Sequence, residues 1–273
     1  MTGPDDTASA LGLALSANAI EVSRDGSRRA VDRAWVPEVP VALEFNGVSF
    51  AVMMATPSHL EDFATGFAIC EGLAARADLI VDIDVAQVDL GWIVRATVED
   101  MGIEALAERV RTRVAESSCG LCGIENLEAV ARPLPPVAAH PQVEPAAIFR
   151  ALDLLRQSQP LGRRTGAAHA AAHARMDGTL SCVREDVGRH NAMDKLIGAK
   201  ARLGEPLSSG FALSSARCSY EIVEKAVKAG ATTLVSVSLP TGMAVERARA
   251  AGLSLWVLAR DDSVLLVTDG ADA

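Results

Sequence analysis

The stretch that decides the fold runs from Phe211 to Thr268 and reads FALSSARCSYEIVEKAVKAGATTLVSVSLPTGMAVERARAAGLSLWVLARDDSVLLVT. Short apolar runs alternate in it with segments of helical periodicity, and Gly230 and Gly252 stand where helix C-caps belong. This alternation predicts crossover units and a largely parallel sheet that is covered on both faces. The predicted elements are a strand at 211–214, a helix at 220–229, a strand at 232–238, a helix at 244–251 and strands at 255–259 and 264–268.

The segment before this stretch adds a helix and a hairpin to the same C-terminal part. The helix is predicted at 146–157, and alternating strands at 168–174 and 180–183 flank the turn sequence Asp177-Gly178. Together these elements predict an α/β domain.

The N-terminal half predicts a smaller α+β part. Alternating runs at 41–45 and 48–52 flank Asn46-Gly47, which is the sequence of a hairpin with a type I′ turn. Further elements are predicted downstream, namely strands at 81–85 and 92–98 and a helix at 103–115.

A helix is also predicted between the hairpin and these downstream strands. Ser58 and Glu61 have the spacing of a capping box, which marks a helix start. Apolar residues at helical spacing continue from there to Cys70. We therefore expect the Cys70 thiol to lie in the core.

The composition of the 273 residues limits the class of protein. Hydrophobic residues make up 49% of the chain and charged ones 22%, which supplies a core and excludes disorder of the bulk. The net charge of −9 argues against a general nucleic-acid-binding protein. We recognise no signal peptide and no apolar run that could span a bilayer, and the five cysteines are an odd number. We therefore expect a reduced, cytoplasmic protein without membrane contact.

Four segments are expected along the chain. Residues 1–35 form a partly disordered N-terminal arm, and residues 36–132 form the α+β part, which ends in a loop with two cysteines. Residues 133–145 hold five prolines in 13 positions and are interpreted as a linker. Residues 146–273 form the C-terminal α/β domain.

The sharpest chemical feature is the pair Cys119 and Cys122, flanked by Gly120 and Gly123. As half of a structural zinc site the pair lacks a second cysteine pair, and we expect no metal ion. As a thioredoxin-like motif it would follow a strand, but here it follows a predicted helix. Inert surface cysteines are a further alternative. A glycine-flanked loop with two thiols suits sulfur or thiol exchange between two partners.

The run REDVGRHNAMDK at 184–195 gathers charged residues at the start of a predicted helix. Arginines beside a helix N-terminus favour recognition of phosphate or pyrophosphate, and a structural ion-pair network is the alternative. Flanking segments at 163–169 and 214–221 place arginines, a histidine and hydroxyls where α/β proteins bind ligands. Taken alone, His169 is more typical of a core histidine.

Seven ordered motifs between Pro37 and Thr268 resemble the FdhD family, the sulfur carrier proteins required for formate dehydrogenase activity. The most specific is the Arg-Glu-Asp-Val-Gly-Arg-His run at 184–190. The motifs are 38–47, 53–57, 61–67 with Glu71-Gly72, 119–123, Thr165-Gly166 with 169–171, 184–195 and 215–221.

The resemblance implies a sulfurtransferase that accepts sulfur from a cysteine desulfurase as a persulfide on Cys119, with Cys122 as its partner thiol. The sulfur then passes to the molybdenum cofactor in its bis(guanine dinucleotide) form, which goes into formate dehydrogenase. The cofactor is thus a bound substrate, and GDP-like nucleotides are its mimics. The resemblance also implies a homodimer and a three-layer C-terminal domain similar to cytidine deaminase.

The resemblance places cofactor binding in the C-terminal domain. The cofactor-binding stretch of the family corresponds here to Leu258, Ala259, Arg260, Asp261, Asp262 and Ser263. Its usual aromatic start and closing arginine are replaced by Leu258 and Ser263. The other candidate cofactor-binding residues come from the basic run and its flanking segments: His169, Arg184, Arg189, His190 and Arg217.

Two other functions compete with that of a sulfur carrier. A zinc deaminase is disfavoured, because His169-Ala-Ala171 lacks the glutamate that this chemistry needs and the cysteine pair precedes the histidine. The alternative is a non-catalytic chaperone that binds the guanine dinucleotide cofactor and whose cysteines are redox-protective.

Overall fold

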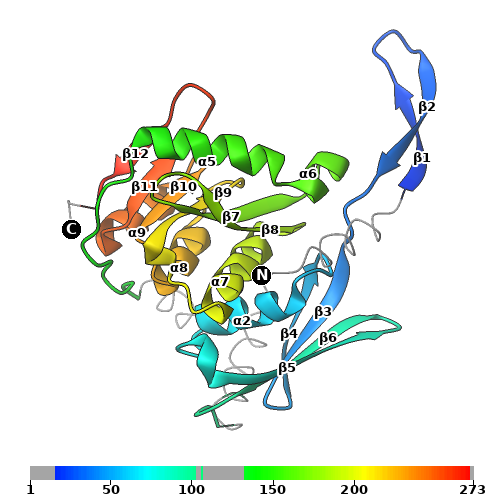
Figure 1. Cartoon of the computed structure of the whole chain (residues 1–273). Helices are drawn as coiled ribbons and strands as arrows, with labels where there is room; N and C mark the ends of the chain where they lie inside the picture. The colour runs from blue at the N-terminus through cyan, green and yellow to red at the C-terminus, as the bar shows by residue number, and fades with distance from the viewer. Residues whose placement is uncertain (1–15, 103–105, 107–131, 271–273) are drawn as a thin grey trace.

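The computed structural model describes residues 16–102, Leu106 and residues 132–270. The largest of its sheets has six strands in the order β12-β11-β10-β9-β7-β8 (Figure 1). These strands are β7 (His169–Arg175), β8 (Leu180–Asp186), β9 (Gly210–Ser214), β10 (Thr233–Ser236), β11 (Ser254–Val257) and β12 (Leu265–Thr268).

The six-stranded sheet is mixed in direction. β9, β10 and β11 run parallel, and α8 (Tyr220–Lys228) and α9 (Gly242–Ala251) form the crossovers between them. β7 pairs antiparallel with both β8 and β9, and β12 pairs antiparallel with β11. The prediction of a largely parallel sheet is therefore wrong outside β9–β11. The reason is that short connections join β7 to β8 and β11 to β12, and these are too short to cross over a sheet face.

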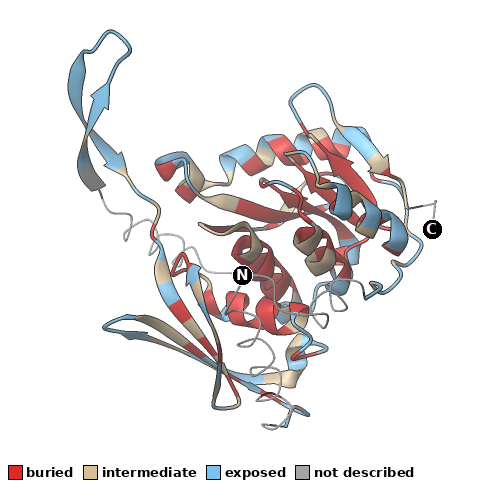
Figure 2. Ribbon diagram, turned by 180° about the vertical axis from the view of Figure 1, so that it is seen from behind, coloured by how far each residue is buried: buried red, intermediate tan, exposed pale blue. Residues whose placement is uncertain are grey.

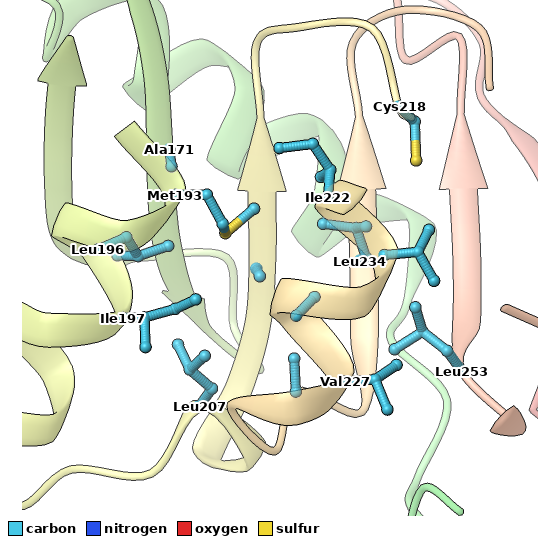
Figure 3. Packing of buried hydrophobic residues seen from close by; sticks show 14 of the residues in the cluster. Ala171, Met193, Leu196, Ile197, Leu207, Cys218, Ile222, Val227, Leu234 and Leu253 are labelled. Carbon is cyan, nitrogen blue, oxygen red and sulfur yellow. The ribbon is translucent and has the colours of Figure 1, made fainter. Parts of the chain in front are cut away.

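Helices cover both faces of this sheet. α5 (Pro145–Gln157) lies across one face, and α7 (Arg189–Arg202), α8 and α9 cover the other (Figure 1). On β9, Phe211 and Leu213 pack on the α5 side, whereas Ala212 packs on the side of α7 and α8, whose core Figure 3 shows. The C-terminal part thus has the expected three layers, while its likeness to cytidine deaminase stays a prediction.

Within the described part of the chain, no helix is both long and apolar enough to cross a bilayer.

A second sheet, in the order β4-β3-β6-β5, forms the N-terminal part together with α2 (Leu60–Cys70). The strands are β3 (Val39–Phe45), β4 (Val48–Ala55), β5 (Ile80–Val88) and β6 (Gly91–Val98), and the one-turn helix η1 (Ala77–Leu79) precedes β5.

The structure bears on three predictions for the N-terminal part. The type I′ turn predicted at Asn46-Gly47 is confirmed, because the two residues have φ angles of 49° and 79°. Cys70 is 3% exposed, as predicted. Of the helix predicted at 103–115, only the buried Leu106 belongs to the described residues.

The capping box predicted at the start of α2 is not formed. The N-cap residue is His59, with a φ of 51°, and it makes no capping hydrogen bond through its side chain. Glu61 instead pairs with Arg202 of α7. This tertiary ion pair engages the carboxylate that a capping box would use.

The N-terminal and C-terminal parts share an extensive interface, because α2 packs along α7. The predicted linker at 133–145 also lies against the C-terminal part. The main-chain N–H of Val137 donates to the carbonyl oxygen of Ala251 at 2.7 Å, and Val143 is buried. The proline-rich segment is therefore a docked connection.

Residues 16–34, which the sequence predicts to lie in a partly disordered arm, form a hairpin of β1 (Ser16–Val22) and β2 (Arg28–Ala34). The hairpin projects from the rest of the chain and is largely exposed (Figures 1 and 2). Main-chain pairing and an ion pair of 2.6 Å between Glu21 and Arg29 stabilise it. Neither contribution appears in the apolar periodicity of the sequence.

Candidate functional site

The carboxyl ends of β8, β9, β10 and β11 meet at one edge of the six-stranded sheet, where β7 begins. Hydrogen bonds join loop residues to neighbouring strands at this carboxyl edge. The N–H of Ala170 donates to the Oγ of Ser215 at 2.8 Å, and the N–H of Ala259 donates to the carbonyl oxygen of Ser236 at 3.2 Å. Helix N-termini and loops converge at such an edge, which is where open α/β sheets bind ligands.

His169 and Arg189 both lie at the carboxyl edge. His169 begins β7 opposite Asp186, the last residue of β8, and Arg189 is the first residue of α7. Burial lowers the pKa of His169, and the charge of Arg189 lowers it further against the opposing effect of Asp186. His169 is therefore neutral at pH 7, with one ring nitrogen that donates and one that accepts.

His190, the second residue of α7, faces Glu221 of α8. The His190 Nε2 lies 3.6 Å from the Glu221 carboxylate. Burial lowers the pKa of His190, as does the charge of Arg189, while Glu221 raises it. The Arg189 Nε is shielded from solvent and has no hydrogen-bond partner among the described residues, and Arg217 lies exposed in the neighbouring β9–α8 loop. An anionic ligand would supply the acceptor that Arg189 lacks.

A cleft of about 420 Å³ opens beside β7 and β9 at the same edge. Its walls include Arg156 of α5, Arg163 of α6 (Pro160–Thr165), His169 and Ser215. Two guanidiniums, a neutral imidazole and a hydroxyl can all donate to phosphate oxygens. Sequence reasoning included Arg163 in a flanking segment but missed Arg156, which in the sequence is one more charged residue on the polar face of a predicted helix.

The predicted cofactor-binding segment at 258–263 connects β11 to β12 at the carboxyl edge. Leu258 has a φ of 50°, and the N–H of Arg260 donates to the carbonyl oxygen of Ser263 at 2.8 Å, which closes a turn. Ala259 is buried, whereas the last four residues of the segment are exposed. The segment thus lies at the same edge of the sheet as His169, with β10 and β9 between β11 and β7.

Arg184, in contrast, points away from the carboxyl edge. Its side chain is 5% exposed and pairs with Asp62 of α2 at 2.8 Å, and Asp62 also pairs with Arg202 at 2.7 Å. Alternate side chains of β8 point to opposite faces, which directs Arg184 to α2 and Glu185 to the first N–H groups of α6. The structure therefore does not support cofactor contact by Arg184 and assigns it to a structural ion pair.

The interior of the 184–195 run is an ion-pair network. Asp186 and Lys195 approach to 2.6 Å with neither side chain exposed, and Asp186 also accepts the N–H of Thr56 at 3.1 Å. The ion-pair interpretation of the run is thus confirmed, while its recognition of phosphate stays a prediction. The network lies inside the protein, and a candidate anion site lies at the first turn of α7.

Cys119 and Cys122 lie outside the described residues. The described cysteines are Cys70, Cys182 and Cys218, and all three are buried; Cys218 is labelled in Figure 3. Burial raises the pKa of each thiol, that of Cys218 to about 12. Such thiols are poor nucleophiles at neutral pH. Among the described residues, no group of three or more His, Cys, Asp or Glu side chains could hold a metal ion.

Comparisons with known proteins agree with one another. The FdhD/NarQ family matches residues 36–271. Sulfur carrier protein FdhD of Cupriavidus necator is 46% identical over 218 residues, which cover 80% of this chain and 76% of that protein. The protein of the same name from Xanthomonas euvesicatoria is 44% identical over 238 residues, with coverage of 87% and 85%. A solved structure described as a "putative formate dehydrogenase accessory protein" from Desulfotalea psychrophila has a TM-score of 0.75 at 22% identity, covers 94% of this chain and 97% of that chain, and so shows the same fold. With the family match and these identities extending over most of its length, the chain belongs to the FdhD/NarQ family.

Proposed function

We propose that the protein is a sulfur carrier for formate dehydrogenase. It accepts sulfur from a cysteine desulfurase as a persulfide on Cys119 and transfers it to the molybdenum cofactor in its bis(guanine dinucleotide) form, which is its substrate. The shared name of the relatives from Cupriavidus and Xanthomonas supports the sulfur-carrying role. We further propose that the protein works as a homodimer, and that desulfurase and formate dehydrogenase are its protein partners.

The observation that carries the binding part of the proposal is the shielded, unpartnered Nε of Arg189 at the carboxyl edge. Arg156, Arg163 and Arg217 lie around the same edge, although the whole chain has a net charge of −9. A guanine dinucleotide carries a pyrophosphate, whose oxygens accept charge-assisted hydrogen bonds from guanidinium groups. The edge therefore suits the nucleotide end of the cofactor.

The sulfur steps follow from thiol exchange. The Cys119 thiolate attacks the outer sulfur of the desulfurase persulfide, a new S–S bond forms on Cys119, and the desulfurase cysteine leaves as a thiolate. The Cys122 thiolate then attacks the Cys119 Sγ and releases the outer sulfur as hydrosulfide at the metal. The product is a Cys119–Cys122 disulfide, which an external thiol reduces. The buried Cys70, Cys182 and Cys218 take no part in these steps.

Intact-protein mass spectrometry tests the first step. After incubation with a cysteine desulfurase and cysteine, the protein is expected to gain about 32 Da, roughly one sulfur, and to lose it with reductant. Cys122→Ala keeps the gain, and Cys119→Ala loses it. A gain that persists in Cys119→Ala contradicts the assignment of the carrier cysteine.

Calorimetry with GDP tests the binding site. Arg189→Ala is expected to weaken GDP binding by about tenfold, because a charge-assisted hydrogen bond is lost. Arg28→Ala, at the tip of the projecting hairpin, removes the same charge and serves as the control. Equal losses in the two variants would show only an effect of net charge. ADP in place of GDP tests whether the guanine base is recognised.

The chaperone alternative predicts a different result for Cys119→Ala. A sulfur carrier with this change keeps its affinity for GDP but no longer activates formate dehydrogenase. A non-catalytic chaperone keeps both properties, so activation of apo formate dehydrogenase by Cys119→Ala decides between the two functions.

A further inference from the structure

One ion pair ties the segment 258–263 to helix α5. The Arg156 guanidinium donates to the carboxylate of Asp261, and it also lies 3.4 Å from Asp153 on its own helix. The segment contains one arginine and two aspartates, so its own charge is −1. An acidic segment is a poor partner for phosphate. A cation for phosphate binding at this corner must therefore come from a neighbouring element, and Arg156 is in contact with the segment.

Arg156 belongs at the same time to the wall of the cleft that contains Arg163, His169 and Ser215. The side chain of Arg156 is 50% exposed and that of Asp261 is 80% exposed. Pairs this exposed are weak, because water already solvates both charges. A phosphate offers a guanidinium the same two-oxygen geometry as a carboxylate, with more negative charge. Phosphate in the cleft can thus compete with Asp261 for Arg156.

We propose that Asp261 is a placeholder for a ligand phosphate. Its carboxylate occupies the Arg156 guanidinium in the free protein, and a phosphate of the guanine dinucleotide replaces it and releases the segment 258–263 from α5. The inference rests on the proposed function, since it takes the carboxyl edge as the nucleotide site. It makes Arg156 a phosphate-binding residue and Asp261 an internal competitor that lowers affinity and couples binding to the position of the segment.

A double-mutant cycle with GDP tests the placeholder. Asp261→Asn is expected to raise the affinity for GDP by about two- to fivefold, because the ligand no longer has to break the Arg156–Asp261 ion pair. This factor corresponds to the free energy of an exposed ion pair. Asp262→Asn removes the same charge one residue away but leaves the Arg156 partner in place, so its gain is expected to be smaller. Arg156→Gln lowers the affinity, and in that background Asp261→Asn is expected to produce no more gain than Asp262→Asn.

The choice of ligand isolates the phosphate. Inorganic pyrophosphate is expected to show the same gain as GDP in Asp261→Asn, whereas guanosine, which has no phosphate, is expected to show none. Equal gains from Asp261→Asn and Asp262→Asn, or a full gain that persists without Arg156, overturn the proposal.

The failures of the two proposals are distinguishable. If the unchanged protein binds neither GDP nor pyrophosphate, both the proposed nucleotide site and the proposed role of Asp261 are wrong. If it binds GDP but the double-mutant cycle shows no coupling between Arg156 and Asp261, only the proposed role of Asp261 is wrong. The persulfide on Cys119 is measured separately and is independent of either result.

Discussion

Gly66 of α2 and Gly198 of α7 bring the backbones of their helices into direct contact. A Cβ on Gly66 would lie 1.8 Å from the carbonyl oxygen of Asp194, and a Cβ on Gly198 would lie 1.8 Å from that of Asp62. α2 belongs to the N-terminal part and α7 to the C-terminal part, so this crossing holds the two sheets in one arrangement. The buried pair of Asp62 and Arg184 joins the same two parts.

Gly66→Ala is expected to lower the free energy of unfolding by about 3 kcal/mol, because α7 must shift to admit a methyl group. Urea unfolding measures the change. Gly242→Ala is the control, since a Cβ there meets nothing within 4 Å, and its effect is expected to stay within about 0.5 kcal/mol. Similar losses in both variants would mean that the helix crossing tolerates a side chain.

Arg184→Met is expected to lower the free energy of unfolding by about 3 kcal/mol, because it leaves the buried Asp62 without one of its two cationic partners. The folded variant is expected to bind GDP as the unchanged protein does. Arg189→Met is expected to behave in the opposite way, with weaker GDP binding and little change in stability. Urea unfolding and calorimetry on both variants measure this difference. Weaker GDP binding by the folded Arg184→Met variant would show that Arg184 contributes to the nucleotide site.

His173 is expected to make stability depend on pH. It is 1% exposed, and its ring nitrogens lie 2.7 Å from the Ser181 Oγ and 3.1 Å from the carbonyl oxygen of Leu207. Burial, together with the charge of Lys200, lowers the pKa of His173 to about 4. The unfolded chain, with a histidine pKa of about 6.5, therefore takes up a proton first as the pH falls, and stability is lost between these two values.

The loss from this group alone is expected to reach about 3 kcal/mol at pH 4 relative to pH 7. Urea unfolding at a series of pH values gives the free energy of unfolding as a function of pH. The loss due to His173 appears as the difference between the slopes of this free energy against pH for the unchanged protein and for His173→Gln. Parallel curves for the two proteins would show that His173 titrates normally in the folded state.

The three described cysteines are expected to be unreactive in the native protein. A variant with Cys119→Ser and Cys122→Ser retains only the buried Cys70, Cys182 and Cys218, whose raised pKa values keep them as thiols. Titration with a thiol reagent at pH 7.5 is expected to give a negligible fast reaction until denaturant is added. Fast labelling of one thiol in the native variant would show that a cysteine other than Cys119 and Cys122 can also react and could carry sulfur.

The predictions from the sequence that the structure confirms concern features with a local cause. The type I′ turn at Asn46-Gly47 depends on two residues that tolerate positive φ, and the αL conformation of Gly252 ends α9 as its position after an apolar run indicates. The capping box failed because Glu61 has a stronger partner in Arg202, 141 residues further along the chain. No window of the sequence contains that pairing.

The sequence by itself determined most of the secondary-structure elements, with the β1–β2 hairpin and α6 as exceptions, since periodicity and turn chemistry are local. It also determined the family and the short list of charged residues in the 184–195 run, which depend on residue order. Only the tertiary structure decided what each charge does. The alternation of β8 directs Arg184 into a buried pair with Asp62, and the start of α7 places Arg189 at the carboxyl edge. It also brought Arg156 from α5 to the segment 258–263, a contact across 105 residues. The reason is physical: burial and the distance between partners set the energy of a charge, and both are properties of the packed chain.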